Sequence, residues 1–264
     1  MVNPFETPGM AAGYAKARPP VHAHVLDLVR EKLGGRLNAR HVLDVGCGAG
    51  LSTKPLLAFA GFCLGVEPAA AMLRCAAGVA PGARFVVASA ENLPVRTGSI
   101  DLIAAAGSLN YVKLDSFFPE ASRVLAPGGI LLVYDFSAGR SFRSTEDLDH
   151  WFGHFRARYP IPAGEAVKLS PEILERIGTG FRLSDHAYFE TGIRMTAESY
   201  AAYMMTETNV AKAIRDGIPH REILEWLRET LEPVFEGPER EVVFRGYYAC
   251  MEPSVVQSLR HFQE

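Results

Sequence analysis

Short apolar runs alternate with helix-like segments over the first half of the chain. The apolar runs are bounded by glycine, proline or polar residues, which is typical of buried strands. They lie at residues 41–45, 62–67, 84–88, 100–105 and 130–136. Apolar residues recur at helical spacing between them, at about 51–60, 68–78 and 114–125. Strands that alternate with helices predict an α/β fold with a doubly wound, mainly parallel sheet.

The pattern changes after residue 136. Two more strands are expected, at 181–190 and 241–251, and Ser170-Pro171-Glu172 predicts a helix start. Residues 196–235 contain two helical stretches. At the other end, residues 1–20 mix Pro, Gly and small residues, so we expect an irregular arm there, followed by a helix at 21–33. We therefore predict one domain over 1–264. Its parts are a core at about 36–136, 171–190 and 239–252, a lid at 137–170 and 191–238, and an N-terminal arm at 1–34.

Composition narrows the class of protein. The chain has 264 residues, 48% of them hydrophobic and 22% charged, which is ordinary for a globular protein. A net charge of −3 gives no reason to expect a nucleic acid as partner. The sequence has neither a long apolar run nor a signal-peptide pattern, so we expect no membrane span and a cytoplasmic location. The four cysteines have no CxxC spacing and are expected to be reduced.

The segment His41–Gly50, HVLDVGCGAG, is the most informative motif. A strand, a glycine turn and a helix-competent segment form the layout of a nucleotide-binding loop. The glycines fall as GxGxG, and Leu51 stands where a dinucleotide loop has its third glycine. Asp44 ends the strand, where it could hold a cationic amine, and Glu67 ends the next strand, where an acid usually meets ribose hydroxyls.

These motifs resemble those of the class I S-adenosylmethionine (SAM)-dependent methyltransferases. The resemblance extends over residues 40–136 and includes AENLP and the segment FFPEASRVLAPGGILLVYDF. Within the family, the chain resembles the broad group that includes the ubiquinone and menaquinone methyltransferases. It implies a Rossmann-like sheet of seven strands, one of them antiparallel, with SAM as cofactor and S-adenosylhomocysteine as product. The implied cofactor-binding residues are Asp44, Gly46, Cys47, Gly48, Gly50, Glu67, Pro68, Met72, Ser89, Ala90, Glu91 and Ala106.

By the same resemblance, Asp44 and the backbone of the loop and of Ala106 would hold the methionine part. Glu67 would accept hydrogen bonds from the ribose, and Met72 and Ala90 would pack against adenine. Ser89 stands where the family usually has an acid.

Methyl transfer mainly requires alignment of the reactants and exclusion of water. No HExxH, CxxC or GxSxG motif occurs, so neither a metal nor a covalent nucleophile is expected. The first candidates for a catalytic residue are Tyr14, Tyr111 and His150. The further candidates are Asn110, Tyr134 and His154. His22 and His24 lie on the expected N-terminal helix and are expected to be solvated, and His186, in a predicted strand, is expected to have no catalytic role.

The acceptor is expected to be an apolar or amphipathic small molecule, because the lid is rich in aromatic and methionine side chains. These side chains could instead simply pack the lid helices together. Ser108-Leu109-Asn110-Tyr111 lacks the prolines of the amino-methylating nucleic-acid enzymes.

Two alternatives stay open, a non-catalytic protein that binds SAM or S-adenosylhomocysteine and a nicotinamide-dependent oxidoreductase. A monomer and a homodimer are both compatible with the sequence.

Overall fold

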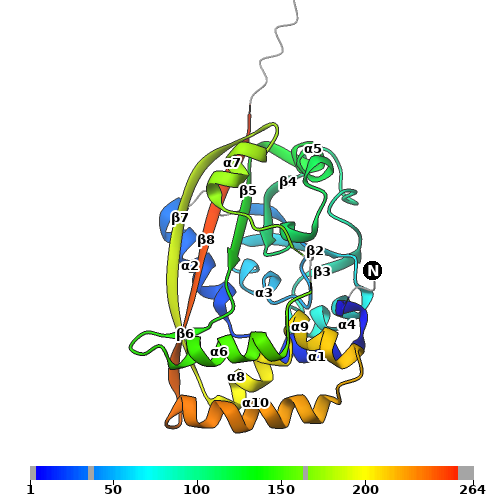
Figure 1. Ribbon diagram of the computed structural model, residues 1–264. Helices are drawn as coiled ribbons and strands as arrows, with labels where there is room; N and C mark the ends of the chain where they lie inside the picture. Colours follow the sequence, from blue (N-terminus) through cyan, green and yellow to red (C-terminus); the bar gives the residue numbers. More distant parts are fainter. Residues whose placement is uncertain (1–3, 35–38, 163–165, 255–264) are drawn as a thin grey trace, which may run out of the picture.

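A mixed sheet of eight strands forms the centre of the computed structural model, which describes residues 4–34, 39–162 and 166–254 (Figure 1). The strand order is β3-β2-β1-β4-β5-β8-β6. Strands β5 and β6 pair with one edge of β8, and β7 pairs with its other edge. Strands β1 to β5 are parallel, whereas β8 runs antiparallel to its neighbours β5, β6 and β7. The strands are β1 (Ala39–Val45), β2 (Ala60–Glu67), β3 (Arg84–Val87), β4 (Ile100–Ala106), β5 (Leu125–Phe136), β6 (Ser141–Phe142), β7 (Phe181–Met195) and β8 (Arg240–Pro253).

Ten α-helices are described around this sheet. They are α1 (Pro8–Ala17), α2 (Val21–Leu33), α3 (Thr53–Leu56), α4 (Ala70–Val79), α5 (Leu114–Val124), α6 (Asp147–Arg158), α7 (Pro171–Ile177), α8 (Ala197–Met204), α9 (Thr208–Arg215) and α10 (His220–Phe235). Helices α6, α8, α9 and α10, called the capping helices below, lie with α1 beyond the carboxyl end of β5 (Figure 1). No helix among the described residues is both long and apolar enough to cross a membrane.

Neighbouring residues of the central strands pack into two separate cores. Val42 and Leu132 contribute to the core shared with α2 and the capping helices. Leu43 and Val133 contribute to the core shared with α5 and α7. Successive side chains of a strand point to opposite faces, so the apolar runs cover both faces of the sheet. This arrangement confirms the predicted doubly wound α/β fold.

Several predicted elements differ from the structure. Residues 8–17 form helix α1 and not an irregular arm, because Thr7 accepts a hydrogen bond from the Met10 amide and Pro8 suits the first helical position. The helix expected at 51–60 is only the four-residue α3, since β2 already begins at Ala60 and pairs with Ala39. Strand β5 begins at Leu125, before the strand expected at 130–136, and its pairing with β4 is irregular between Leu125 and Ile130.

The last third of the chain also departs from expectation. Three helices, and not two, occupy residues 196–235, because α9 separates α8 from α10. The short strand β6 raises the number of strands from the expected seven to eight. Strand β7 continues to Met195, five residues beyond the expected end, and remains paired with β8 along this extension.

Candidate cofactor site

The glycine loop connects β1 to α3 through backbone conformations that suit glycine. Gly46, Gly48 and Gly50 have φ values of +69°, +52° and +83°. A Cβ atom at Gly46 would lie 2.3 Å from the Cβ of Ser108, and one at Gly50 would lie 3.1 Å from the Cα of Ala76. The loop is therefore held closely between the exit of β4 and helix α4.

Asp44 is a fully buried carboxylate at the start of this loop. Its Oδ2 atom accepts hydrogen bonds from Ser52 Oγ at 2.8 Å and Thr53 Oγ1 at 2.6 Å. Its Oδ1 atom is buried and has no hydrogen-bond partner among the described residues. Burial raises the pKa of Asp44 from its ordinary value of 3.8 to about 6, against the effect of the two hydroxyl groups. An unpaired buried carboxylate oxygen is suited to a cationic ligand.

Glu67, at the end of β2, also contacts the glycine loop. Its Oε2 atom accepts from the Gly48 amide at 3.2 Å, and its Oε1 atom accepts from the Ala69 amide at 2.9 Å. Burial raises the pKa of this carboxyl, and the two backbone donors oppose the rise. Each carboxylate oxygen has a second lone pair, so Glu67 can stabilise the loop and still accept a ligand hydroxyl.

The other residues expected at the cofactor surround these two acids. Met72 packs with Ala49 and Ala69 in a small apolar cluster beside the loop. Cys47 is buried, Ala106 ends β4, and Pro68 follows Glu67 and is exposed.

A second group of expected residues follows β3. Ala90 is buried and Ser89 is exposed, while Glu91 Oε1 accepts a hydrogen bond from the Lys113 amide at 3.0 Å. The structure thus brings all the expected cofactor residues to the carboxyl ends of the parallel strands, where ligands of such sheets bind.

Helix α1 packs over the glycine loop, and Arg18 anchors its end. Ala11 and Tyr14 of α1 belong to the same cluster as Met72. The Arg18 guanidinium stacks on Tyr14, with its Cζ atom 4.4 Å from the ring centroid, and forms a 2.9 Å ion pair with Glu207. It also donates to the Thr206 carbonyl at 3.1 Å. The arm is thereby tied to the junction of α8 and α9.

The three first candidates for a catalytic residue differ in their surroundings. Tyr14 and Tyr111 both interact electrostatically with Arg18. Tyr14 lies under Arg18 beside the loop, whereas the Tyr111 side chain is 58% exposed after β4. The His150 side chain is 75% exposed and lies 4.0 Å from Glu146 on α6. Exposure of His150 to solvent argues against a role in a reaction that requires water to be excluded.

Two half-buried polar pairs near the end of β5 were not expected from the sequence. The expectation that His22 is solvated is wrong: its Nδ1 atom lies 3.1 Å from the Tyr134 hydroxyl, and burial, with Arg18 nearby, lowers its pKa to about 4. Asn110 donates to Asp135 Oδ2 at 2.8 Å, and burial raises the pKa of that carboxyl. No local pattern in the sequence indicated either pair, because each joins segments that are distant in the chain.

Aromatic side chains of the capping helices largely pack against one another. Trp151 stacks on Phe155 at 5.3 Å and on Trp226 at 6.0 Å between ring centroids, and Tyr200 lies 5.8 Å from Trp151. The alternative that these residues pack the lid helices together is therefore confirmed for this cluster.

The sheet order, the GxGxG loop and the two acids together define a Rossmann-like methyltransferase fold. Residues 43–133, less than half of the chain, match the family described as a methyltransferase domain. This match confirms the predicted class, the class I methyltransferases that use SAM, and no comparison favours an oxidoreductase.

Two curated relatives illustrate the extent of the similarity. The ubiquinone/menaquinone biosynthesis C-methyltransferase UbiE of Campylobacter jejuni is 36% identical over 145 residues, covering 49% of this chain and 62% of that protein. Trans-aconitate 2-methyltransferase of Delftia acidovorans is 39% identical over 100 residues, covering 36% of this chain and 37% of that protein. The matched region thus spans less than two thirds of either relative.

Solved structures agree with the fold over most of the chain. A candidate type II methyltransferase of Anaeromyxobacter dehalogenans superimposes with a TM-score of 0.62 at 22% identity, covering 86% of this chain and 95% of that chain. The YcgJ protein of Bacillus subtilis superimposes with a TM-score of 0.52 at 20% identity, covering 86% of this chain and 96% of that chain. The similarity therefore extends beyond the matched domain to the fold as a whole.

Proposed function

We propose that this protein transfers a methyl group from SAM to a small-molecule acceptor and releases S-adenosylhomocysteine. The observation that carries the proposal is the unpaired, buried Oδ1 atom of Asp44 beside the glycine loop. This oxygen fits the cationic amine of the methionine part of SAM. The pyrophosphate of a dinucleotide would instead meet the negative charge of Asp44.

The proposed roles follow from the contacts around the loop. Asp44 binds the amine, and the backbone of Gly46, Gly48 and Ala106 surrounds the methionine part. Glu67 accepts hydrogen bonds from the ribose hydroxyls with its remaining lone pairs. The other expected binding residues complete the walls, with adenine between Met72 and Ala90 and with Cys47, Gly50, Pro68, Ser89 and Glu91 around it.

When bound, SAM supplies a methyl group on a sulfonium: the bond from acceptor to carbon forms as the carbon–sulfur bond breaks, and the electron pair of that bond stays on sulfur. The protein aligns the acceptor and excludes water, which is the proposed role of α1 and the capping helices as a lid. Tyr14 remains the candidate for contact with the reactants, because α1 holds it beside the loop. An amine or thiol acceptor that reacts in its neutral form needs little help from a base.

The acceptor is proposed to be a small amphipathic molecule and not a nucleic acid. A cytoplasmic location and a monomeric or homodimeric state remain predictions.

Isothermal titration with S-adenosylhomocysteine tests the cofactor assignment, with NADH as the comparison ligand. We expect a dissociation constant on the order of micromolar for the first ligand and no binding of the second. Asp44→Asn should weaken the binding by about tenfold or more, because the amine loses a charge-assisted partner. Asp27→Asn is the matched control, since Asp27 is exposed on α2 and pairs with Arg30 at 3.2 Å. Binding of NADH in preference, or equal affinity in the Asp44 variant, would overturn the proposal.

A further inference from the structure

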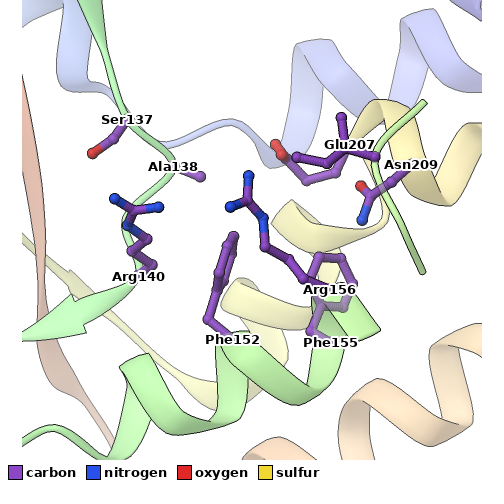
Figure 2. A pocket seen from close by; sticks show the side chains of 9 residues that line it. Ser137, Ala138, Arg140, Phe152, Phe155, Arg156, Glu207 and Asn209 are labelled. Atoms are coloured by element: carbon purple, nitrogen blue, oxygen red, sulfur yellow. The ribbon is translucent and has the colours of Figure 1, made fainter. Parts of the chain in front are cut away.

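A pocket of about 210 Å³ lies between the segment after β5, helix α6 and the start of α9 (Figure 2). Phe152 and Phe155 of α6 form an apolar part of its lining. Arg140, from the segment after β5, and Arg156, from the last turn of α6, bring two guanidinium groups toward the same space (Figure 2). The pocket therefore combines aromatic surface with two positive charges.

The two pocket arginines differ from their neighbours in the chain. Within the described residues, neither Arg140 nor Arg156 forms an ion pair or a hydrogen bond. By contrast, Arg143 pairs with Glu190 at 2.7 Å and with Glu241 at 3.0 Å.

Glu207, the acidic residue in the pocket lining, already forms an ion pair with a residue outside the lining. Glu207 pairs with Arg18 at 2.9 Å, so its charge does not compensate the two pocket arginines. Arg156 lies over the ring of Phe152, with Cζ 5.4 Å from the centroid, an arrangement that orients a guanidinium while leaving its N–H donors available. The pocket thus carries a net positive charge with free donors.

The position of the pocket connects it to the candidate cofactor site. Its first lining residue, Ser137, directly follows Phe136, the last residue of β5. On the opposite side, Glu207 binds Arg18, and Arg18 stacks on Tyr14 of the cluster beside the glycine loop. The pocket is therefore at the carboxyl end of the sheet, on the side closed by α1 and the capping helices.

We propose that this pocket binds the anionic group of the acceptor, a carboxylate or a phosphate-type group, between Arg140 and Arg156. Phe152 and Phe155 contact the apolar part of the same molecule. This inference rests on the proposed function and narrows the acceptor from an amphipathic small molecule to an amphipathic organic anion. Guanidinium groups suit both kinds of anion because their paired N–H donors match two oxygen atoms.

Ligand-observed NMR titration tests this proposal with three probes that share a benzyl group: phenylacetate, benzylphosphonate and the neutral phenylacetamide. The titrations are made at constant ionic strength, with and without S-adenosylhomocysteine. We expect at least one anion to bind about tenfold or more tightly than phenylacetamide. Preference for phenylacetate would identify a carboxylate site, and preference for benzylphosphonate a phosphate-type site. Arg140→Gln and Arg156→Gln should each reduce the preferred anion's affinity by about tenfold.

Arg143→Gln is the matched control, because it removes the same charge from an arginine outside the pocket. Equal affinity for anions and phenylacetamide would overturn the proposal. So would an equal loss of anion affinity in the Arg143 variant and the two pocket variants. Titration with S-adenosylhomocysteine alone is the separate readout for the proposed function: if it binds while neither anion does, only the assignment of the pocket fails.

Discussion

Replacing Asp44 with Asn separates the energetic cost of this buried carboxylate from its use in binding. Burial raises its pKa from 3.8 to about 6, so the folded protein binds this proton more tightly than the unfolded chain. The resulting contribution to stability is fully present below the unfolded pKa and is lost as pH rises through the folded pKa. A rise of about two in pKa lowers the free energy of unfolding by about 3 kcal/mol above about pH 6, relative to acidic pH. Asparagine does not titrate, so Asp44→Asn avoids this loss.

Urea unfolding, followed by circular dichroism, measures the free energy of unfolding of both proteins between about pH 4 and pH 7.5. We expect the difference, variant minus wild type, to increase by about 2 kcal/mol across this range, because part of the effect is already lost at pH 4 and the other titrating groups cancel. Near neutral pH, saturating S-adenosylhomocysteine should stabilise the wild type much more than the variant. A difference that is constant with pH would refute the reasoning, since it would mean that burial does not raise the pKa of Asp44.

Three further substitutions test the loop and the arm. Glu67→Gln should weaken S-adenosylhomocysteine binding by about tenfold or more in calorimetry, because one amide oxygen replaces two carboxylate acceptors; unchanged affinity would contradict the role of Glu67. Gly46→Ala should lower the free energy of unfolding by about 2–4 kcal/mol in denaturant titration, because its Cβ would lie 2.3 Å from Ser108 Cβ at a φ of +69°; an unaltered midpoint would count against this geometry. Arg18→Gln should accelerate amide exchange in residues 8–17, because the ion pair with Glu207 is lost; wild-type exchange rates would show that Arg18 does not hold the arm.

The parallel half of the sheet was predictable because its signals are local. Each strand from β1 to β5 is a short apolar run, and the glycines after β1 mark a loop whose left-handed conformations favour that residue. Asp44 and Glu67 could be placed at the carboxyl end because they end two such runs. Thr7-Pro8 was also a local helix signal, but the small and proline-rich composition of the arm obscured it.

Contacts between distant segments could not be predicted in the same way. Arg18 and Glu207 are 189 positions apart, and neither position carries a local pattern that indicates the ion pair. The pairing of His22 with Tyr134 depends on how α2 packs on β5, and a histidine in an amphipathic helix is compatible with either face. The cavity between α6 and α9 arises only when the capping helices are assembled.

The long pairing of β7 with β8 has a consequence for how such a protein can vary in sequence. Met195, the last residue of β7, is paired with Arg240, the first residue of β8. The 44 residues between them, 196–239, which include α8, α9 and α10, therefore leave and re-enter the sheet at adjacent positions. A segment whose ends already meet can vary in length and sequence at little cost in loop-closure entropy. This part of the chain is thus a natural unit of exchange, which recombination can replace while the strand order and the glycine loop stay unchanged.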